Sequence, residues 1–276
     1  MKSTPTDPVR KCAVCGTFYP GDARELAESV DSLVRDVPPR DKGTVRGIVA
    51  PHAGYTYSGA TAAAAYGTLR GSSFATVVIV SPSHHEYFEG VSIFDGDAYA
   101  TPLGVVPIDA DARKALLEYS SVIHASREGH GAEHAVEVHL PFLQRMVGTF
   151  SLLPLVIGHP TRATCLALAE TLGGALKGRP LLFVASSDLS HFYPATVAHQ
   201  LDRVALDDLI DFDALALMSH LEEGKTEACG GGPIVAVLTA LKKLGASRVD
   251  VVGYATSGDV TGDDRSVVGY ASAVVS

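Results

Sequence analysis

Three short apolar runs in the sequence each end in a turn that carries a histidine. The histidines are His52, His84 and His191, and the runs are residues 47–50, 76–80 and 181–185. An apolar run that stops at a turn before a helical pattern is typical of a strand ending at the carboxyl edge of an open α/β sheet. Imidazole binds metal ions and transfers protons at neutral pH. Three such turns in one chain therefore predict one shared site.

An acidic residue and a cysteine add two further groups to this site. Asp188 lies three residues before His191, and Cys229 lies in residues 227–233, the most glycine-dense stretch of the chain. A helix is expected over residues 234–244, so Cys229 should precede a helix N-terminus, where the helix dipole favours thiolate. If the three strands are neighbours, these side chains converge with the histidines.

Such a set of donors suits a transition metal. Two neutral imidazoles, one anionic ligand and open positions fit Fe(II), with Cu and Zn as the other candidates, and a thiolate shifts the preference toward softer or borderline ions. Simpler interpretations stay open for single residues. Asp188 could cap the helix that follows it, and His85, beside His84, could face solvent.

One segment superficially resembles the His-Glu-x-x-His motif of zinc peptidases. His134 and His139 are five positions apart rather than four, which turns them off a common helical face, so we reject a metallopeptidase. Glu133, His134 and Glu137 are instead expected to share one side of a helix, because i, i+4 neighbours project together.

The other cysteines have less defined roles. Cys12 and Cys15 form a Cys-x-x-Cys pair, but no second pair or histidine pair completes a zinc site. The flanking residues also lack the strand and helix that surround a thioredoxin-type motif. The role of this pair stays open, and Cys165, in an apolar helical stretch, is expected in the core.

Apolar periodicity outlines the elements that would position these residues. Helices are expected over residues 21–36, 57–66, 109–119, 162–176, 197–210, 212–222 and 234–244. Strands are expected at the three histidine runs, as a hairpin or edge strands within 90–108, and at 151–157, 248–255 and 266–274. This alternation predicts a single α/β domain, residues 1–276, with a mixed or mainly parallel central sheet and helices on both faces.

Composition limits the classes of function. The chain has 276 residues, 46% of them hydrophobic and 19% charged, and its net charge is −9. A negative chain is not expected to bind nucleic acid or a membrane surface, and no apolar run reaches the roughly 18 residues of a membrane span. The first residues lack the apolar segment of a secretory signal. We expect a cytoplasmic protein with a small-molecule or peptide substrate, and the sequence is compatible with a homo-oligomer.

Residues 51–59, Pro-His-Ala-Gly-Tyr-Thr-Tyr-Ser-Gly, resemble the signature of the Memo family (mediator of ErbB2-driven cell motility). The bacterial and archaeal members of this family are called AmmeMemoRadiSam system protein B. Five further segments resemble motifs of the family and, with the first, span nearly the whole chain. They are residues 13–20, 81–85, 133–141, 186–191 and 228–230.

The resemblance implies the fold of class III extradiol dioxygenases, non-haem iron enzymes that open catechol rings. By this resemblance, His52 and His84 match the two histidine ligands, and Cys229 takes the place of the iron-binding glutamate. His191 matches the acid/base histidine, and Asp188 lies beside it. Cysteine at the carboxylate position departs from the dioxygenase pattern, because a thiolate ligand is easily oxidised. Eukaryotic members are associated with phosphotyrosine-peptide binding and with copper or iron redox chemistry.

Three functions are compatible with these residues. The first is a metal-dependent redox enzyme of unknown substrate, with His52, His84 and Cys229 as ligands and His191 as acid/base. The second is a non-catalytic module that binds a peptide or a small anionic ligand in the same pocket. The third is a cysteine hydrolase with Cys229 as nucleophile and His191 as base, which leaves the other two histidines without a role.

Overall fold

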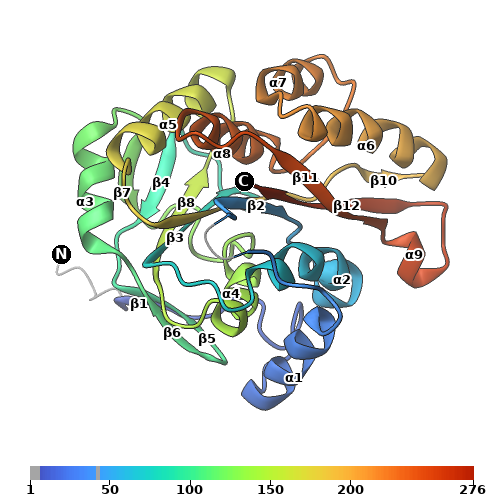
Figure 1. The fold of residues 1–276 in the computed structure, drawn as a ribbon, viewed down its shortest axis with the longest axis horizontal. Helices are drawn as coiled ribbons and strands as arrows, with labels where there is room; N and C mark the ends of the chain where they lie inside the picture. The colour runs from blue at the N-terminus through green and yellow to red at the C-terminus, as the bar shows by residue number, and fades with distance from the viewer. Residues whose placement is uncertain (1–6, 42–43) are drawn as a thin grey trace.

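A mixed β-sheet forms the centre of the molecule (Figure 1). The structure is a computed structural model that describes residues 7–41 and 44–276. Within these residues the large sheet has nine strands, in the order β10-β12-β2-β9-β3-β8-β4-β7, and β11 also pairs with β12. The strands are β2 (Gly47–Ala50), β3 (Thr76–Pro82), β4 (Val91–Phe94), β7 (Ile123–Ser126), β8 (Ser151–Ile157), β9 (Leu181–Ser186), β10 (His191–Tyr193), β11 (Val249–Thr256) and β12 (Val267–Val275).

Four neighbouring strands, β2, β9, β3 and β8, run parallel. On either side of this group the direction changes, because β12 pairs antiparallel with β2 and β4 pairs antiparallel with β8. The predicted α/β fold with a mixed central sheet flanked by helices is confirmed. The parallel group brings the carboxyl ends of its strands to one edge of the sheet.

The apolar runs form strands because both faces of the sheet are covered. Every residue of β3 is buried. Along this strand Val78 and Val80 belong to one apolar core, whereas Val77 and Ile79 belong to the core on the opposite face. A strand covered on both faces needs a continuous apolar run rather than an alternating one, as β3 has.

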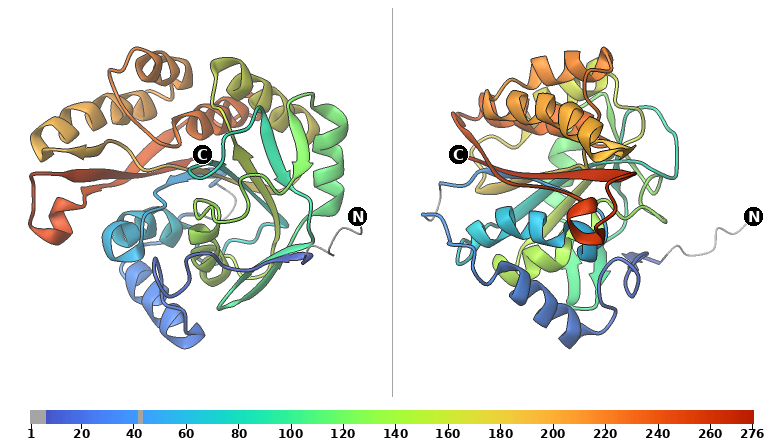
Figure 2. Two further views of the ribbon diagram at one scale, coloured as in Figure 1. Left: turned by 180° about the vertical axis from the view of Figure 1, so that it is seen from behind. Right: turned by 90° about the vertical axis from the view of Figure 1, so that its right-hand side faces the viewer.

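Helices pack on the two faces (Figure 2). One face carries α3 (Ala110–Tyr119), α5 (Arg162–Ala175), α6 (Ala195–Ile210), α7 (Ala214–Glu222) and α8 (Gly231–Lys243). The other carries α1 (Ala23–Val34), α2 (Tyr55–Tyr66) and α4 (Leu140–Met146). Alanines of α2 are buried against β2 and β12, because small side chains let the helix approach the sheet closely. Cys165 of α5 lies in the core, as predicted.

A second, small sheet joins β1 (Val9–Arg10), β5 (Ala98–Thr101) and β6 (Gly104–Pro107). Strands β5 and β6 form an antiparallel hairpin, which the sequence predicts within residues 90–108. Beyond β1 the chain continues into the Cys-x-x-Cys pair, whose bonding state the sequence leaves open. Cys12 and Cys15 form a disulfide.

The helix predicted from Glu133 is wrong in its first turns. A 3-10 turn, η2 (Glu137–His139), precedes α4, and residues 133–136 are not helical. The Glu133 carboxylate accepts hydrogen bonds from the backbone N–H groups of His134 and Ala135, and such local bonds compete with helix formation. Glu133 and Glu137 therefore bind different partners instead of sharing one helical face.

Several short elements are absent from the sequence prediction: β1, β7, β10, the 3-10 turn η1 (Gly67–Leu69) and α9 (Gly258–Thr261). Each has two to four residues, too few for apolar periodicity to be read. None of the helices in the described part of the chain combines the length and apolarity needed to cross a membrane.

Candidate metal site

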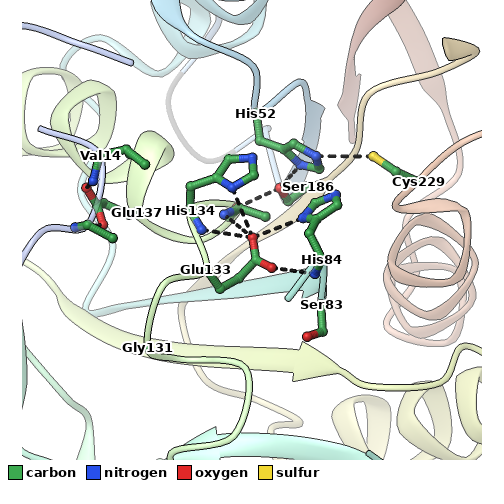
Figure 3. Close-up of polar contacts among 12 residues, drawn as sticks. Val14, His52, Ser83, His84, Gly131, Glu133, His134, Glu137, Ser186 and Cys229 are labelled. Carbon is green, nitrogen blue, oxygen red and sulfur yellow. Dashed lines mark hydrogen bonds and ion pairs between the residues drawn. The ribbon is translucent and has the colours of Figure 1, made fainter. Parts of the chain in front are cut away.

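The turns after β2, β9 and β3 meet at one edge of the sheet because these three strands are neighbours. They carry His52, Asp188 and His84, and Cys229 approaches from the loop before α8 (Figure 3). Donor atoms of His52, His84 and Cys229 all lie within 4.8 Å of one another. The structure thus brings the three predicted ligands together, and their role as ligands stays a prediction.

His52 is 1% exposed, and its two ring nitrogens face different groups. Nδ1 lies 2.7 Å from the Ser186 hydroxyl, and Nε2 lies 3.1 Å from the Cys229 sulfur. Ser186 donates its only proton to the Ala135 carbonyl, so its oxygen accepts the proton on Nδ1. This network leaves the Nε2 lone pair directed at Cys229. Burial, and then the charge of His84, hold the pKa of His52 well below its usual value, so the ring is neutral.

His84 is oriented by a carboxylate. Its Nδ1 lies 3.0 Å from Oε1 of Glu133, and its backbone N–H donates to Oε2 at 2.5 Å. Burial acts to raise the pKa of Glu133, but the hydrogen bonds and charge of His84 outweigh it and lower that pKa to about 2. Burial likewise opposes charge on His84, and Glu133 outweighs it and raises the pKa of His84. Because Nδ1 donates to this carboxylate, Nε2 is the nitrogen left for a ligand.

Cys229 immediately precedes the N-cap of α8, Gly230, as the sequence predicts. Its sulfur accepts a hydrogen bond from the backbone N–H of Asp188 at 3.3 Å. Burial, and then the charge of Asp188, raise the pKa of the Cys229 thiol. The expected thiolate is therefore not favoured without a cation, because burial outweighs the helix dipole. A metal ion that binds this sulfur has to displace its proton.

Asp188 is buried next to the histidine turn rather than at a helix end. Its Oδ1 accepts the backbone N–H of His52 at 2.8 Å, and its Oδ2 lies 3.9 Å from His52 Nε2. Burial raises the pKa of Asp188 to about 7, against hydrogen bonds from the N–H groups of His52 and Ala53. This carboxyl group therefore exchanges its proton near neutral pH.

His191 lies on β10, which pairs with β12 at the sheet edge. Burial lowers the pKa of His191, so its ring is neutral at pH 7. When protonated, His191 would also act to lower the pKa of His52, so the two rings lie within electrostatic range of each other. The three-residue donor group does not include His191. The next residue, Phe192, has a left-handed φ of 65° and a 74% exposed ring.

A third imidazole adjoins the two predicted histidine ligands. The ring of His134 stacks on His84 with centroids 5.0 Å apart and lies edge-on to His52 at 5.5 Å. Burial lowers the pKa of His134 to about 4. The sequence prediction assigns no role at this site to His134, Glu133 or Ser186. Glu133 and His134 follow a loop rich in charge and glycine, outside the histidine turns. Ser186 begins the third histidine turn of the sequence and ends β9 in the structure, but a single serine there gave no signal of its contact with His52.

His85 is exposed, in line with its simpler interpretation. His139 is buried, and its Nε2 lies 2.8 Å from the Ser186 hydroxyl. Burial lowers the pKa of His139 to about 3. His139 thus contacts Ser186, which in turn contacts His52, and its orientation does not match that of a peptidase zinc ligand.

Comparisons with known proteins agree with this architecture. The chain is 36% identical to a MEMO1 family protein of Methanothermobacter thermautotrophicus, covering 95% of this chain and 99% of that protein. A MEMO1 family protein of Methanosarcina mazei is 37% identical, covering 97% and 99%. The crystal structure of an uncharacterized protein from Escherichia coli K12 shares the fold, with a TM-score of 0.53 and 16% identity over 82% of this chain and 99% of that one. The Memo-like protein family matches residues 10–274, and the chain therefore belongs to the Memo family.

Proposed function

We propose that this chain is a metal-dependent redox protein, with His52, His84 and Cys229 as the ligands. The donor set, two imidazoles and one sulfur, suits Fe(II), Cu or Zn. We favour Fe(II) because of the resemblance to non-haem iron enzymes. The substrate class is a small molecule or a peptide that reaches the edge of the sheet. When bound, the metal would supply Lewis-acid and one-electron chemistry in the pocket.

The observation that carries the proposal is the state of the two imidazoles. Each ring uses Nδ1 as a donor, His52 toward Ser186 and His84 toward Glu133. A ligating histidine commonly donates its second nitrogen in this way, which fixes the tautomer and the ring orientation. Both rings are held before any ion arrives, so little movement of the rings opposes binding. Because the pKa of His84 is raised, an ion has to displace the proton that Nε2 carries when this ring is charged.

Two groups could move protons beside this donor set. Asp188, with a pKa raised to about 7 by burial, can accept the proton that Cys229 must release. His191, whose pKa burial lowers, is neutral and can act as a general base toward a substrate. His134 adjoins His52 and His84 and adds a neutral ring against which a substrate can pack.

The hydrolase alternative is less well supported. It requires Cys229 next to His191, whereas the partners of the Cys229 sulfur are His52 and the backbone of Asp188. The raised pKa of the thiol also works against a nucleophilic thiolate. A binding module remains the second function of the same pocket if no metal is taken up.

The test is metal analysis of protein purified without oxygen and then reconstituted separately with Fe(II), Cu(I) and Zn(II). We expect close to one equivalent of bound metal. Co(II) substitution should add a sulfur-to-cobalt charge-transfer band that Cys229→Ser abolishes. Occupancy below about a tenth of an equivalent after every reconstitution would contradict the proposal, because three preset donors should retain an ion.

A further inference from the structure

The N-terminal clamp, defined as residues 10–19, binds the segment that carries Glu133 through a buried carboxylate. Glu137 has no exposed surface. Its oxygens accept the backbone N–H groups of Ala13 at 2.7 Å and Val14 at 3.0 Å, and the Tyr19 hydroxyl at 2.6 Å. Figure 3 shows Glu137 beside Val14. These three groups of the clamp donate to one charge, and Arg10, also in the clamp, adds a fourth donor.

Arg10 supplies the balancing charge and extends the contact. Its guanidinium lies 2.5 Å from Glu137 and is 6% exposed. It also donates to the backbone carbonyls of His130 at 2.6 Å, Gly131 at 3.2 Å and Glu133. Because a buried charge that loses its partner is strongly unfavourable, the clamp and residues 130–137 hold one another in place.

The clamp reaches the metal site at two points. Glu133, whose carbonyl Arg10 holds, fixes the backbone and ring of His84. At the other end of the clamp, the Phe18 carbonyl accepts the backbone N–H of Tyr55. The Phe18 ring lies edge-on to His134, with ring centroids 4.8 Å apart. The position of the clamp therefore affects the groups that orient the predicted ligands.

The disulfide closes around the two residues that bind Glu137. Cys12 and Cys15 are linked, so Ala13 and Val14 lie inside the covalent ring with their N–H groups on the carboxylate. Both cysteines are partly exposed, which gives a thiol access to the bond. In a reducing compartment such as the cytoplasm that the sequence predicts, disulfides are usually transient and redox-sensing.

We propose that Cys12–Cys15 is a reversible thiol–disulfide exchange site whose state sets how firmly Glu137, and through it Glu133 and His84, are held. The oxidised form locks the N–H pair onto Glu137. Reduction opens the ring, lets residues 12–15 sample other conformations, and loosens the segment over residues 130–139. The consequence for metal affinity rests on the proposed function, whereas the exchange site itself does not.

The reaction is a two-electron exchange with a dithiol. One thiolate of the dithiol attacks a sulfur of the Cys12–Cys15 bond, which breaks as a mixed disulfide forms and the other cysteine leaves as thiolate. The second thiol of the dithiol then attacks the mixed disulfide. The dithiol ends as a disulfide, and its two electrons and two protons end on Cys12 and Cys15.

The first test needs no metal. Metal-free protein is equilibrated in oxidised and reduced dithiothreitol, the state of Cys12 and Cys15 is read by alkylation and peptide mass, and hydrogen exchange is followed. On reduction, exchange within residues 130–139 should accelerate about tenfold or more, because closure of even a short loop restricts the chain by that order. Exchange in β8 should be unchanged.

Variants supply the controls. Cys12→Ser/Cys15→Ser should show the fast exchange in both buffers, and Cys165→Ser, which alters a core thiol of α5, should respond to reductant as wild type does. Equal exchange in oxidised and reduced wild-type protein would overturn the proposal. So would a disulfide that stays intact in excess dithiothreitol.

The second test compares zinc affinity of the oxidised wild type with that of Cys12→Ser/Cys15→Ser, which has no extra thiols to bind the ion. We expect a loss of about threefold to tenfold in the double variant, less than the tenfold to hundredfold loss expected when a direct partner of a ligand is removed, because the clamp acts on His84 only through Glu133. Faster exchange with unchanged affinity would overturn the coupling to His84. If both proteins bind neither zinc nor, after reconstitution, Fe(II) or Cu(I), the proposed function is refuted instead, and the exchange data then decide on the disulfide alone.

Discussion

Nε2 of His52 lies 3.1 Å from Sγ of Cys229, although 177 positions separate the two residues in the sequence. Each atom is the one that its side chain can offer to an ion, because Nδ1 of His52 is bonded to Ser186. In the metal-free chain the thiol proton can lie between them. If these residues hold a metal as we propose, both atoms would serve as ligands and the proton between them would be released.

Replacing Cys229 with serine should weaken metal binding at least tenfold, because a neutral hydroxyl replaces a soft anionic donor. His191→Ala should leave the affinity within about twofold, since His191 is outside the donor group. Competition with a chromophoric chelator measures both. Metal retained in Cys229→Ser but lost in His191→Ala would show that His191 is the third ligand.

Replacing Glu133 with glutamine should lower metal affinity by roughly tenfold to a hundredfold, as loss of support for a ligating histidine does. The amide keeps the size of the side chain but removes the charge that orients His84. Glu89→Gln is the matched control, because its side chain is 77% exposed. Equal affinities of the two variants, measured by chelator competition, would mean that Glu133 does not support a ligand.

Gly230→Ala should destabilise the chain by about 1–3 kcal/mol, the usual result of forcing a methyl group into packed structure. An added Cβ would lie 1.9 Å from the backbone oxygen of Ser186. Gly131→Ala is the control, since no atom lies within 4 Å of its added Cβ, and it should stay within about 0.5 kcal/mol of wild type. Urea unfolding measures both. Equal stabilities would show that the loop carrying Cys229 can move away from β9.

His130 should make the fold sensitive to mild acid. Burial lowers the pKa of His130 to about 3, and its Nδ1 lies 2.5 Å from the Tyr99 hydroxyl. The unfolded chain binds a proton near pH 6.5, whereas the native chain does not, so stability is full above that pH and falls as the pH drops toward 3. This residue alone should remove about 2 kcal/mol between pH 7 and pH 5.

The measurement is urea unfolding of wild type and His130→Gln at several pH values. The variant lacks this one titration and keeps the other buried histidines, so its stability should fall less steeply between pH 7 and pH 5. Parallel curves for the two proteins would indicate that His130 is protonated in the native state or binds its proton equally in both states.

A strand could be predicted from the sequence wherever it is apolar throughout, because such a strand is buried on both faces of the sheet. The run at β3 and the histidine turn after it follow from residue order alone, because burial requires the first and the sheet edge exposes the second. The position of Cys229 before a helix was also predictable from the glycines that follow it. These glycines allow the loop that carries Cys229 to approach β9 closely. Convergence of these turns depended on β2, β9 and β3 being neighbours, which the resemblance supplied.

Other parts of the site depend on contacts that leave no local pattern. Glu133 acts through a carboxylate that reaches His84, 49 positions away, and its own hydrogen bonds prevent the helix that its spacing suggests. The disulfide also could not be predicted from the sequence, because cysteines spaced as Cys12 and Cys15 are can bind a metal, form a disulfide or remain as free thiols. The raised pKa of the Cys229 thiol depends on its burial. The sequence argument considered only the helix dipole, because burial was not known from the sequence.

The pairing of β12 with β2 bears on the order in which the molecule can be assembled. Ala273 pairs with Val49, more than two hundred positions earlier in the chain. During synthesis the strand that leads to His52 therefore lacks one neighbour until almost all of the chain has left the ribosome. Contacts this distant in sequence form slowly, and a nascent chain halted before β12 would leave an unpaired apolar strand available to another chain. The sheet around the strand that leads to His52 is thus completed late in synthesis.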